Sequence, residues 1–433
     1  MQKAIGVTHA VVFVFVSSIL GGEGRTERPL QVIAVKDGVG LQQAINQPAV
    51  KGFTVRIDQP ITLTCRVQES MVENEVSRHA LLIPPSVDLD LNQSTLRLDL
   101  RSNSHGVRLS SRSSIRNGTI EVIRSEQKGS QSIWHSGISV GAPYDDGGTP
   151  ERPGYFSKVS HWKIEDVTID QQVSASAIQL MSEACHGVIR RVEILDSSTA
   201  LMGIGMDWGS VGTFNTADDK ISSIRKRWEN WEIYTTHPHD ILIDDVKIGH
   251  LGRNIDGNDA GIRCSACYNI RIQNVHVASA ASAVAIFGGD CGFEFAPRSL
   301  RPQAHTGYQI HGVVIEKAFR YGMVLNGLAD NVFRASQKYG YRTLLDPAHP
   351  GLEGVRVANC QLSGGGTPKS QGMFITAVSD LQVRDVSLTE FSIGARIKDW
   401  VTDLHFRNSD LSQNESPVSI FSRIEKPKNL VFE

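Results

Sequence analysis

Apolar and polar residues alternate along most of the chain in a two-part pattern that begins near residue 105. The first part is a glycine or alanine followed by apolar-x-apolar, as in Gly106-Val-Arg-Leu. The second part reads apolar-x-x-apolar-x-apolar, as in Ile164-Glu-Asp-Val-Thr-Ile. Because side chains of a β-strand point alternately to its two faces, this spacing predicts strands with one buried side and one solvent-facing side.

The two parts recur nine times along the chain. The first apolar residues of the second part, called leaders below, are Ile115, Ile164, Ile189, Ile243, Ile272, Ile310, Val357, Val383 and Phe406. Uninterrupted repeats are about 23 to 29 residues long, well short of the ~40 to 45 residues of a propeller blade. This length fits one coil of a three-stranded parallel β-helix, whose stacked coils bury a core that no single coil could bury.

Other local patterns predict how the coils turn and how the solenoid begins. The polar pair inside the second part, such as Glu165-Asp166, predicts a corner between two strands. Ahead of the repeats, the segment 37–46 places Leu41, Ala44 and Ile45 on one helical face. We therefore expect an N-terminal cap over residues 31–104, including a short helix that covers the open end of the core, and about nine coils from residue 106.

The segment Leu41-Gln-Gln-Ala-Ile45, the later stretch 82–96 and the nine repeats together resemble the pectin-lyase-like superfamily of right-handed parallel β-helix proteins. The resemblance covers roughly residues 31 to 411. It implies an all-β, right-handed, three-stranded parallel β-helix with a short N-terminal capping helix. It does not specify the reaction, because the superfamily holds lyases, hydrolases, epimerases and phage spikes.

The longest insertions fall on one side of the predicted solenoid. Four of the nine connections from a first-part strand to the following leader are long, whereas the opposite connections are mostly short. Long loops along one edge of the first-part sheet would make that sheet the floor of a groove, which suits an extended polymer. The alternative is that this edge merely tolerates insertions.

The predicted groove floor offers candidate ligand-binding side chains. The third and fifth residues of each first-part strand point outward, and in the central coils these include Gln179, Asp207 and Arg263. Since neighbouring strands lie ~4.8 Å apart, Asp207 and Arg263 would be within reach of each other and of a bound sugar. A simple cross-strand ion pair is the alternative.

The longest loop, residues 208–240, combines aromatic and titratable residues. Half of the chain's tryptophans lie in it: Trp208, Trp228 and Trp231. Their rings could stack on sugars or pack a small core of the loop itself. The loop ends in Tyr234-Thr-Thr-His237-Pro-His239-Asp240, where the imidazoles titrate near neutrality and the proline fixes the backbone. A structural histidine pair is the alternative to a catalytic one.

This ending resembles the Tyr-x-x-Asp-Pro-His signature of β-helix mannuronan C5-epimerases and their alginate-lyase relatives, with His237 in place of the signature's Asp. The resemblance implies that Tyr234 and His239 remove and deliver a proton. It also implies an assisting acidic residue in the next coil, for which Asp259 is the nearest candidate.

A uronate substrate would itself require particular catalytic groups. Removing the C5 proton of a uronate needs a base, neutralisation of the carboxylate and a proton donor. His239 or Tyr234 could be the base, and Arg263 could grip the carboxylate in two places. Elimination then gives a lyase, and reprotonation on the other face gives an epimerase. No cofactor is certain; Ca²⁺ stays open because residues 256–259 are Asp-rich but lack a spaced ligand pattern.

Basic residues in the two later insertions favour an anionic polymer as the partner. They are Arg298, Arg301, Arg334, Lys338 and Arg342. A solvated charged face is the alternative. A glycoside hydrolase would instead need two carboxylates about 5 to 9.5 Å apart. Candidates for such a pair are Asp207, Asp218, Asp219 and Asp259. A non-catalytic polysaccharide-binding protein would explain the groove and the tryptophans.

Composition and the N-terminus limit the partners and the location. With 44 basic and 46 acidic residues the net charge is −2, which provides no bulk field for nucleic acid or an anionic membrane. The pair Cys264-Ser-Ala-Cys267 lacks the further ligands that a zinc site needs, so we predict no metal there. Lys3 precedes an apolar stretch that ends in glycines, which is typical of an export signal, with an uncleaved anchor as the alternative.

These patterns together predict a signal peptide over residues 1–24 and a single β-helix domain over 25–433. We expect a secreted or periplasmic polysaccharide lyase acting on a uronate-containing polymer, free of the membrane after signal cleavage. A uronan epimerase, a glycoside hydrolase and a binding protein remain the alternatives.

Overall fold

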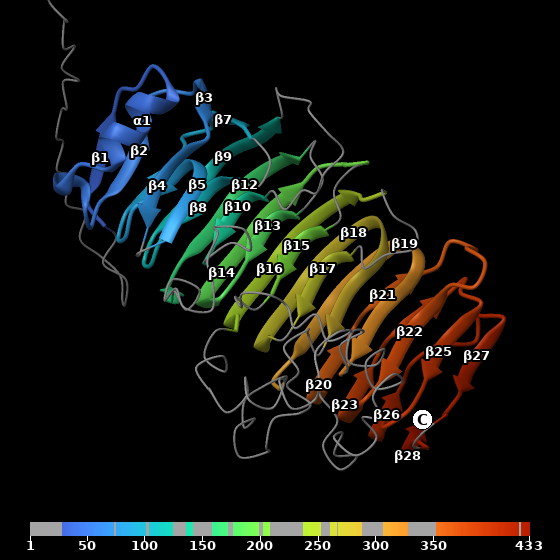
Figure 1. The fold of residues 1–433 in the computed structure, drawn as a ribbon. Helices are drawn as coiled ribbons and strands as arrows, with labels where there is room; N and C mark the ends of the chain where they lie inside the picture. The colour runs from blue at the N-terminus through green and yellow to red at the C-terminus, as the bar shows by residue number, and fades with distance from the viewer. Residues whose placement is uncertain are drawn as a thin grey trace, which may run out of the picture.

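The computed structural model describes residues 28–72, 75–100, 104–123, 136–141, 158–171, 176–198, 202–207, 237–252, 260–265, 267–287, 306–327, 352–423 and 426–433. Within these ranges the chain winds in coils whose strands form three faces, called A, B and C below. The coils stack from the blue N-terminal end to the red C-terminal end (Figure 1). Strand pairing between coils is parallel throughout the described part, except for the hairpin of β4 (Gln68–Val72) with β5 (Glu75–Ile83).

Face A contains the first-part strands. It begins with the end of β5 and continues through β8 (His105–Leu109), β10 (Ser136–Val140), β13 (Ser176–Leu180), β15 (Met202–Met206) and β17 (Ala260–Ser265). It is completed by the ends of β18 (Tyr268–Phe287) and β19 (Gln309–Asn326), then β22 (Gln371–Thr376), β25 (Ile393–Ile397) and β27 (Ser416–Ile420).

Faces B and C contain the second-part strands. Six strands run along face B and turn the corner into face C: β9 (Ser114–Ile123), β12 (Lys163–Gln171), β14 (Glu183–Ile194), β16 (His239–His250), β18 and β19. Face B also holds β1 (Leu30–Ile33), β2 (Thr54–Ile57), β6 (Asp88–Asp90), β20 (Leu352–Ala358), β23 (Val378–Arg384), β26 (Thr402–Arg407) and β28 (Lys428–Phe432). Face C also holds β3 (Thr62–Arg66), β7 (Thr95–Asp99), β21 (Gln361–Ser363) and β24 (Ser387–Thr389). The short β11 (Lys158–Ser160) pairs with the start of β14.

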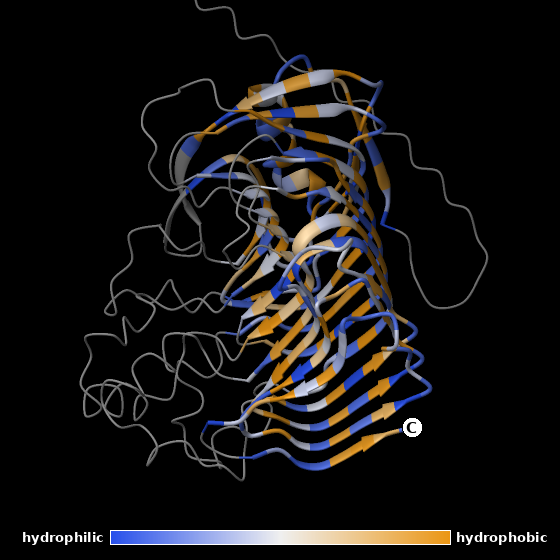
Figure 2. Cartoon of the chain, turned by 90° about the vertical axis from the view of Figure 1, so that its right-hand side faces the viewer, coloured by the Kyte–Doolittle hydropathy of each residue, from blue (hydrophilic) through white to orange (hydrophobic). Residues whose placement is uncertain are grey.

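The register confirms the repeat predicted from the sequence. The nine leaders pair with one another in order, from Ile115 with Ile164 to Val383 with Phe406. They are buried and form part of one continuous core. The apolar residues of the nine first-part strands pair in the same way, from Val107 with Ile138 to Met373 with Ala395. Figure 2 shows the resulting alternation of hydrophobic and hydrophilic residues along the strands.

The polar pairs do form the corner between faces B and C. The second residue of each pair has the left-handed backbone that a tight corner requires, with φ of 54° at Asp166, 50° at Arg191 and 54° at Asp245. Neighbouring corners are joined through their side chains, since Arg191 donates two hydrogen bonds to Asp166, at 2.6 and 2.9 Å.

The predicted N-terminal helix is confirmed, and within residues 31–104 the strands β1, β2, β3, β5, β6 and β7 already pair in parallel as part of the stacked coils. Helix α1 (Gly38–Ile45) begins at Asp37, whose side chain accepts a hydrogen bond from the amide of Gly40. Leu41 and Ile45 are buried in the common core, and Ala44 packs against it. The one-turn helix η1 (Pro48–Val50) follows. Among the described residues, no helix is long and apolar enough to cross a membrane.

The strand order also shows where the long connections start and return. Each of the four joins the end of a face A strand to the start of face B, in agreement with the sequence prediction. Most of their residues, 142–157, 208–236, 288–305 and 328–351, lie outside the described residues, so a loop-walled groove stays a prediction. The five described cysteines, Cys65, Cys185, Cys264, Cys267 and Cys360, are free and buried.

Candidate functional site

Three neighbouring coils place polar side chains in one row where the chain enters face B. Cys185 of β14 pairs with His239 of β16, and His239 pairs with Tyr268 of β18. Each lies four residues before its leader, so the coil register stacks them directly. Ala184, the neighbour of Cys185, belongs to the common core, whereas Cys185 does not. The row therefore points away from the core.

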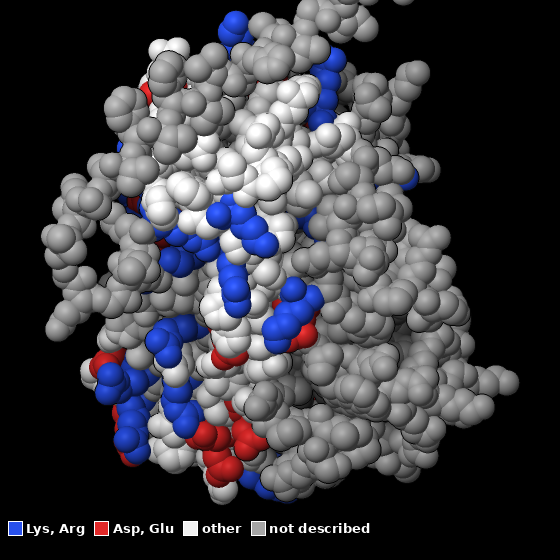
Figure 3. Space-filling model, turned by 90° about the vertical axis from the view of Figure 1, so that its left-hand side faces the viewer, with Lys and Arg blue, Asp and Glu red and all other residues white. Residues whose placement is uncertain are grey.

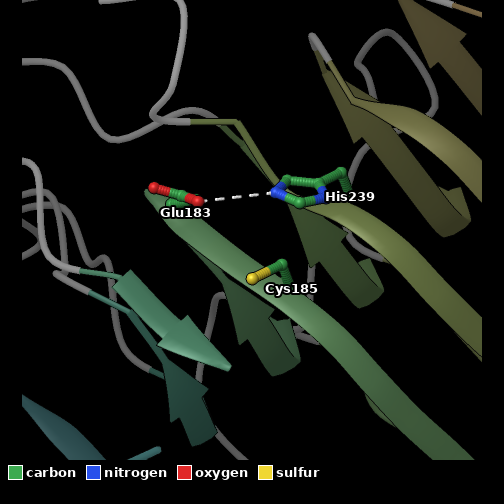
Figure 4. Close-up of side chains that lie close together, drawn as sticks. All are labelled: Glu183, Cys185 and His239. Atoms are coloured by element: carbon green, nitrogen blue, oxygen red, sulfur yellow. Dashed lines mark ion pairs between the residues drawn. The ribbon is translucent and has the colours of Figure 1, made fainter. Parts of the chain in front are cut away.

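His239 lies at the centre of this row and is nearly buried. Its Nδ1 atom lies 2.6 Å from Oδ2 of Asp240, and its Nε2 atom lies 3.7 Å from Oε1 of Glu183. The ring stacks on that of Tyr268, with centroids 4.6 Å apart and planes inclined by 5°. Figure 4 shows the imidazole and Glu183 facing each other, with Cys185 beside them.

Surrounding side chains hold the two carboxylates in place. Lys158 of β11 forms an ion pair with Glu183, and the side-chain amide of Asn269 donates to Asp240. On the solvent side, Nδ1 of His186 lies 3.7 Å from Asp240. His239 is therefore fixed between Glu183 and Asp240, each of which has a second polar partner.

These contacts make His239 a cation at neutral pH. Burial lowers its pKa, but hydrogen bonds to Cys185, Glu183 and Asp240 outweigh burial and raise the pKa to about 10. The pKa values of the two carboxylates shift in the opposite direction. Burial raises the pKa of Glu183 and of Asp240, yet hydrogen bonds to His239 and to Lys158 or Asn269 hold both below their usual range. The arrangement is an imidazolium between two carboxylates.

Tyr268 is a neutral phenol in this setting. Burial raises its pKa, and the negative charges of Asp240 and Glu183 raise it further. Its ring thus provides an apolar face against the charged imidazole, and its hydroxyl keeps its proton.

Arg263 lies on face A, in the predicted outward row. The register continues from Gln179 through Gly205 to Arg263 and then Ala285. The guanidinium carbon lies 5.4 Å from the ring centroid of Phe287, and its buried Nε atom has no hydrogen-bond partner. Within the described residues, no ion pair involves Arg263.

Charge on the molecular surface is local rather than uniform. Figure 3 shows separate groups of basic and acidic side chains on one face, with the acidic ones gathered toward the C-terminal end. Attraction of an anionic ligand would therefore depend on particular groups such as Arg263, as expected for a net charge of −2.

The predicted site residues fall on two adjoining surfaces. Asp207 and Arg263 are on face A, whereas His239 and Asp240 lie past the bend, at the start of face B. Asp207 follows β15, and its amide donates to the carbonyl of Leu180 at 2.9 Å. Within the described ranges, no hydrogen bond or ion pair joins Arg263 to Asp207 or to His239.

Two other predicted residues are buried. Oε1 of Gln179 accepts a hydrogen bond from the Ser176 hydroxyl at 2.5 Å, and a Cβ added to Gly205 would lie 2.6 Å from that same oxygen. The Gln179 amide is thus committed to local contacts. His237 is fully buried, two residues before His239. The other predicted residues lie outside the described ranges: Tyr234, Asp259, Trp208, Trp228, Trp231, Asp218, Asp219, Arg298, Arg301, Arg334, Lys338 and Arg342.

The sequence prediction missed several members of the site, namely Lys158, Glu183, Cys185 and Tyr268. A signal for two of them was present. Cys185, His239 and Tyr268 share one offset from their leaders, so aligning the coils on the leaders places these three side chains in contact. Glu183 and Lys158 had no comparable signal, because isolated charged residues on outward positions usually face solvent.

Comparisons with known proteins show the fold. No family model and no curated protein matches this chain. The tailspike protein of E. coli bacteriophage HK620, solved with a pentasaccharide, is similar with a TM-score of 0.57 and 11% identity, covering 92% of this chain and 62% of that one. Another structure of that tailspike, solved with a hexasaccharide, has a TM-score of 0.53, with the same identity and coverage. The chain has the right-handed parallel β-helix fold.

The chain spans 62% of the length of that tailspike. The Azotobacter vinelandii mannuronan C-5 epimerase AlgE6 A-module is also similar over 92% of this chain and 96% of that module, at 13% identity and a TM-score of 0.34.

Proposed function

We propose that this protein is a secreted carbohydrate-active enzyme that cleaves a uronate-containing polysaccharide by C5 proton abstraction and β-elimination. The observation that carries the proposal is the imidazole of His239, held between Glu183 and Asp240 where the longest connection returns to the solenoid. The solved tailspike structures with bound oligosaccharides support a saccharide ligand on such a fold. Export is inferred from the apolar N-terminal segment.

The electrostatic environment favours His239 as a proton donor, whereas the sequence analysis offered it as a candidate base. A group whose pKa is raised to about 10 carries its proton at neutral pH and serves as a donor. His239 would then protonate O4 of the leaving sugar as the C4–O4 bond breaks. The C5 proton would go to the phenolate form of Tyr234, the residue that the sequence motif offers as a base. The electron pair of the broken C5–H bond would form the C4–C5 double bond.

Arg263 supplies the second requirement of the reaction. Loss of the C5 proton spreads negative charge onto the uronate carboxylate, and a guanidinium can bind that carboxylate through two parallel hydrogen bonds. The Nε atom of Arg263 has no hydrogen-bond partner, which supports a role for this guanidinium in binding the carboxylate. A polymer lying on face A and across the bend would touch both Arg263 and His239.

Neither carboxylate beside His239 could serve as the general acid of a glycoside hydrolase. Glycoside hydrolysis needs one protonated carboxyl group and one ionised carboxylate. Glu183 and Asp240 both have a lowered pKa, so both are ionised at neutral pH. Elimination is therefore favoured over hydrolysis at this site, and an epimerase would share its first step.

The test is to incubate the protein with a panel of uronans and neutral polysaccharides and to record ultraviolet absorbance from the unsaturated product. We expect absorbance to rise with a uronan only. His239→Gln should lose roughly 100-fold or more of this rate, the usual contribution of a proton-transfer group. His276→Gln removes a half-exposed histidine on face C and should keep the rate.

Other products would decide against the proposal. Isomerised uronate without a rise in absorbance identifies an epimerase, and new reducing ends without that rise identify a hydrolase. Full activity of His239→Gln would remove this histidine from the mechanism.

A further inference from the structure

Three different donor atoms converge beside the row of stacked side chains. A carboxylate oxygen of Glu183, the thiol sulfur of Cys185 and a ring nitrogen of His239 all lie within 4.8 Å of one another. Ligands held tetrahedrally at about 2.0 to 2.3 Å from zinc lie about 3.3 to 3.8 Å apart. Small side-chain rotations would bring the three atoms to that spacing.

The orientation of His239 is a second, independent observation. A histidine that binds a metal through one nitrogen usually donates its other N–H to a carboxylate, which fixes the ring and makes it a better ligand. Here Nδ1 lies 2.6 Å from Asp240, so Nε2 is the nitrogen directed toward Glu183. Stacking on Tyr268 further limits rotation of the ring.

Cys185 is the third observation. The thiol belongs to an outward position of the coil, yet it is fully buried, forms no disulfide and is not part of the common core. Its sulfur instead lies beside His239 and Glu183 (Figure 4). Packing of the solenoid core therefore does not account for a cysteine at this position.

We propose that Glu183, Cys185 and His239 bind a zinc-like divalent cation through one oxygen, one sulfur and one nitrogen. Thiolate and imidazole ligands select zinc or cobalt over magnesium or calcium, which prefer oxygen. Three protein ligands leave a fourth position open, as in catalytic rather than structural zinc sites. The cation replaces the proton on Nε2 and competes with Lys158 for Glu183.

This inference goes beyond the proposed function and does not depend on it. It carries one consequence for that function, because Nε2 of His239 cannot hold a cation and a transferable proton together. The cation-loaded protein would therefore lack the proton donor of the elimination reaction. Binding itself is measured without substrate.

The test is a titration of the metal-free protein with Co²⁺, followed by absorbance. We expect one Co²⁺ per chain, a thiolate-to-cobalt charge-transfer band in the near ultraviolet and visible bands of tetrahedral intensity, all removed by added Zn²⁺. Cys185→Ala should lose the charge-transfer band. Cys360→Ala, which removes another buried free thiol, should keep it.

A second variant keeps the test decisive if Cys185→Ala folds poorly. Glu183→Gln keeps the size of the side chain, and we expect it to retain the charge-transfer band but to weaken Co²⁺ binding at least tenfold. The site would be overturned by a wild-type protein that gives no band, or by a band that survives in a folded Cys185→Ala protein. Rapid alkylation of Cys185 without any cobalt band would show a thiolate–imidazolium pair instead. A failed titration leaves the elimination assay standing, because the two readouts are separate.

Discussion

At the scale of single residues, His239 owes its charge to its neighbours rather than to its own burial. Burial alone would lower its pKa, but three hydrogen-bonding partners reverse the shift. Two of these partners, Cys185 and Glu183, come from the preceding coil, and Asp240 follows His239 in the same strand. The pKa of His239 is consequently a property of the coil register as much as of the histidine.

The shift predicts how stability depends on pH. The pKa of His239 rises from 6.5 to about 10 on folding, so its stabilising contribution is complete below pH 6.5 and is lost as the pH rises toward 10. The difference in urea unfolding free energy between the wild type and His239→Gln should therefore be largest near pH 6 and shrink by pH 10. A difference that stays constant across this range would contradict the assigned protonation.

Arg263 provides a second test at this scale. Arg263→Gln removes the guanidinium, so we expect kcat/KM on a uronan to fall about 10- to 100-fold, the loss of a charge-assisted contact. The matched control is Arg396→Gln. Arg396 lies in the same outward row and also contacts an aromatic ring, that of Phe421. Equal losses in the two variants would indicate general surface charge rather than a specific carboxylate contact.

At the scale of elements, close packing between neighbouring coils demands glycine at particular positions. A Cβ added to Gly187 of β14 would lie 2.0 Å from the Trp162 ring, which is fully buried and cannot move aside. Gly187→Ala should therefore lower the unfolding free energy by about 1 to 3 kcal/mol. Gly252 has open space around it, and Gly252→Ala should change stability little. Chemical denaturation of both variants checks this, and similar stabilities would refute the packing argument.

The difference between buried and outward positions of a strand explains what the sequence could and could not predict. Leaders such as Ile189 and Ile243 were predicted residue by residue, because burial on one face imposes a strict spacing and any slip would expose the core. Outward residues follow no such rule. Cys185 and Glu183 acquire their roles only through contact with His239. His239 lies 54 residues after Cys185 along the chain. Arg263 and His239, which the sequence assigned to one uronate, lie on face A and at the start of face B, because the spacing does not show where a strand bends.

At the scale of the whole molecule, a solenoid depends on its ends as well as on its stacking. Each inner coil is covered by two neighbours, whereas the first coil needs a separate cover. Helix α1 provides it, and its Leu41 side chain has no exposed surface. A weakened cap would expose strand edges and apolar side chains that favour association with other molecules.

The cap can be tested within one helix. Leu41→Ala should cost about 2 to 5 kcal/mol of unfolding free energy, the usual loss for a buried leucine, and should increase aggregation measured by light scattering. Val39 lies on the same helix but is 67% exposed, so Val39→Ala should change stability by less than about 0.5 kcal/mol. Because coils support one another in sequence, the loss at Leu41 should first appear as faster hydrogen exchange in β1, β2 and β3. Equal exchange along all coils would show instead that the solenoid unfolds as a single unit, with no special role for its N-terminal end.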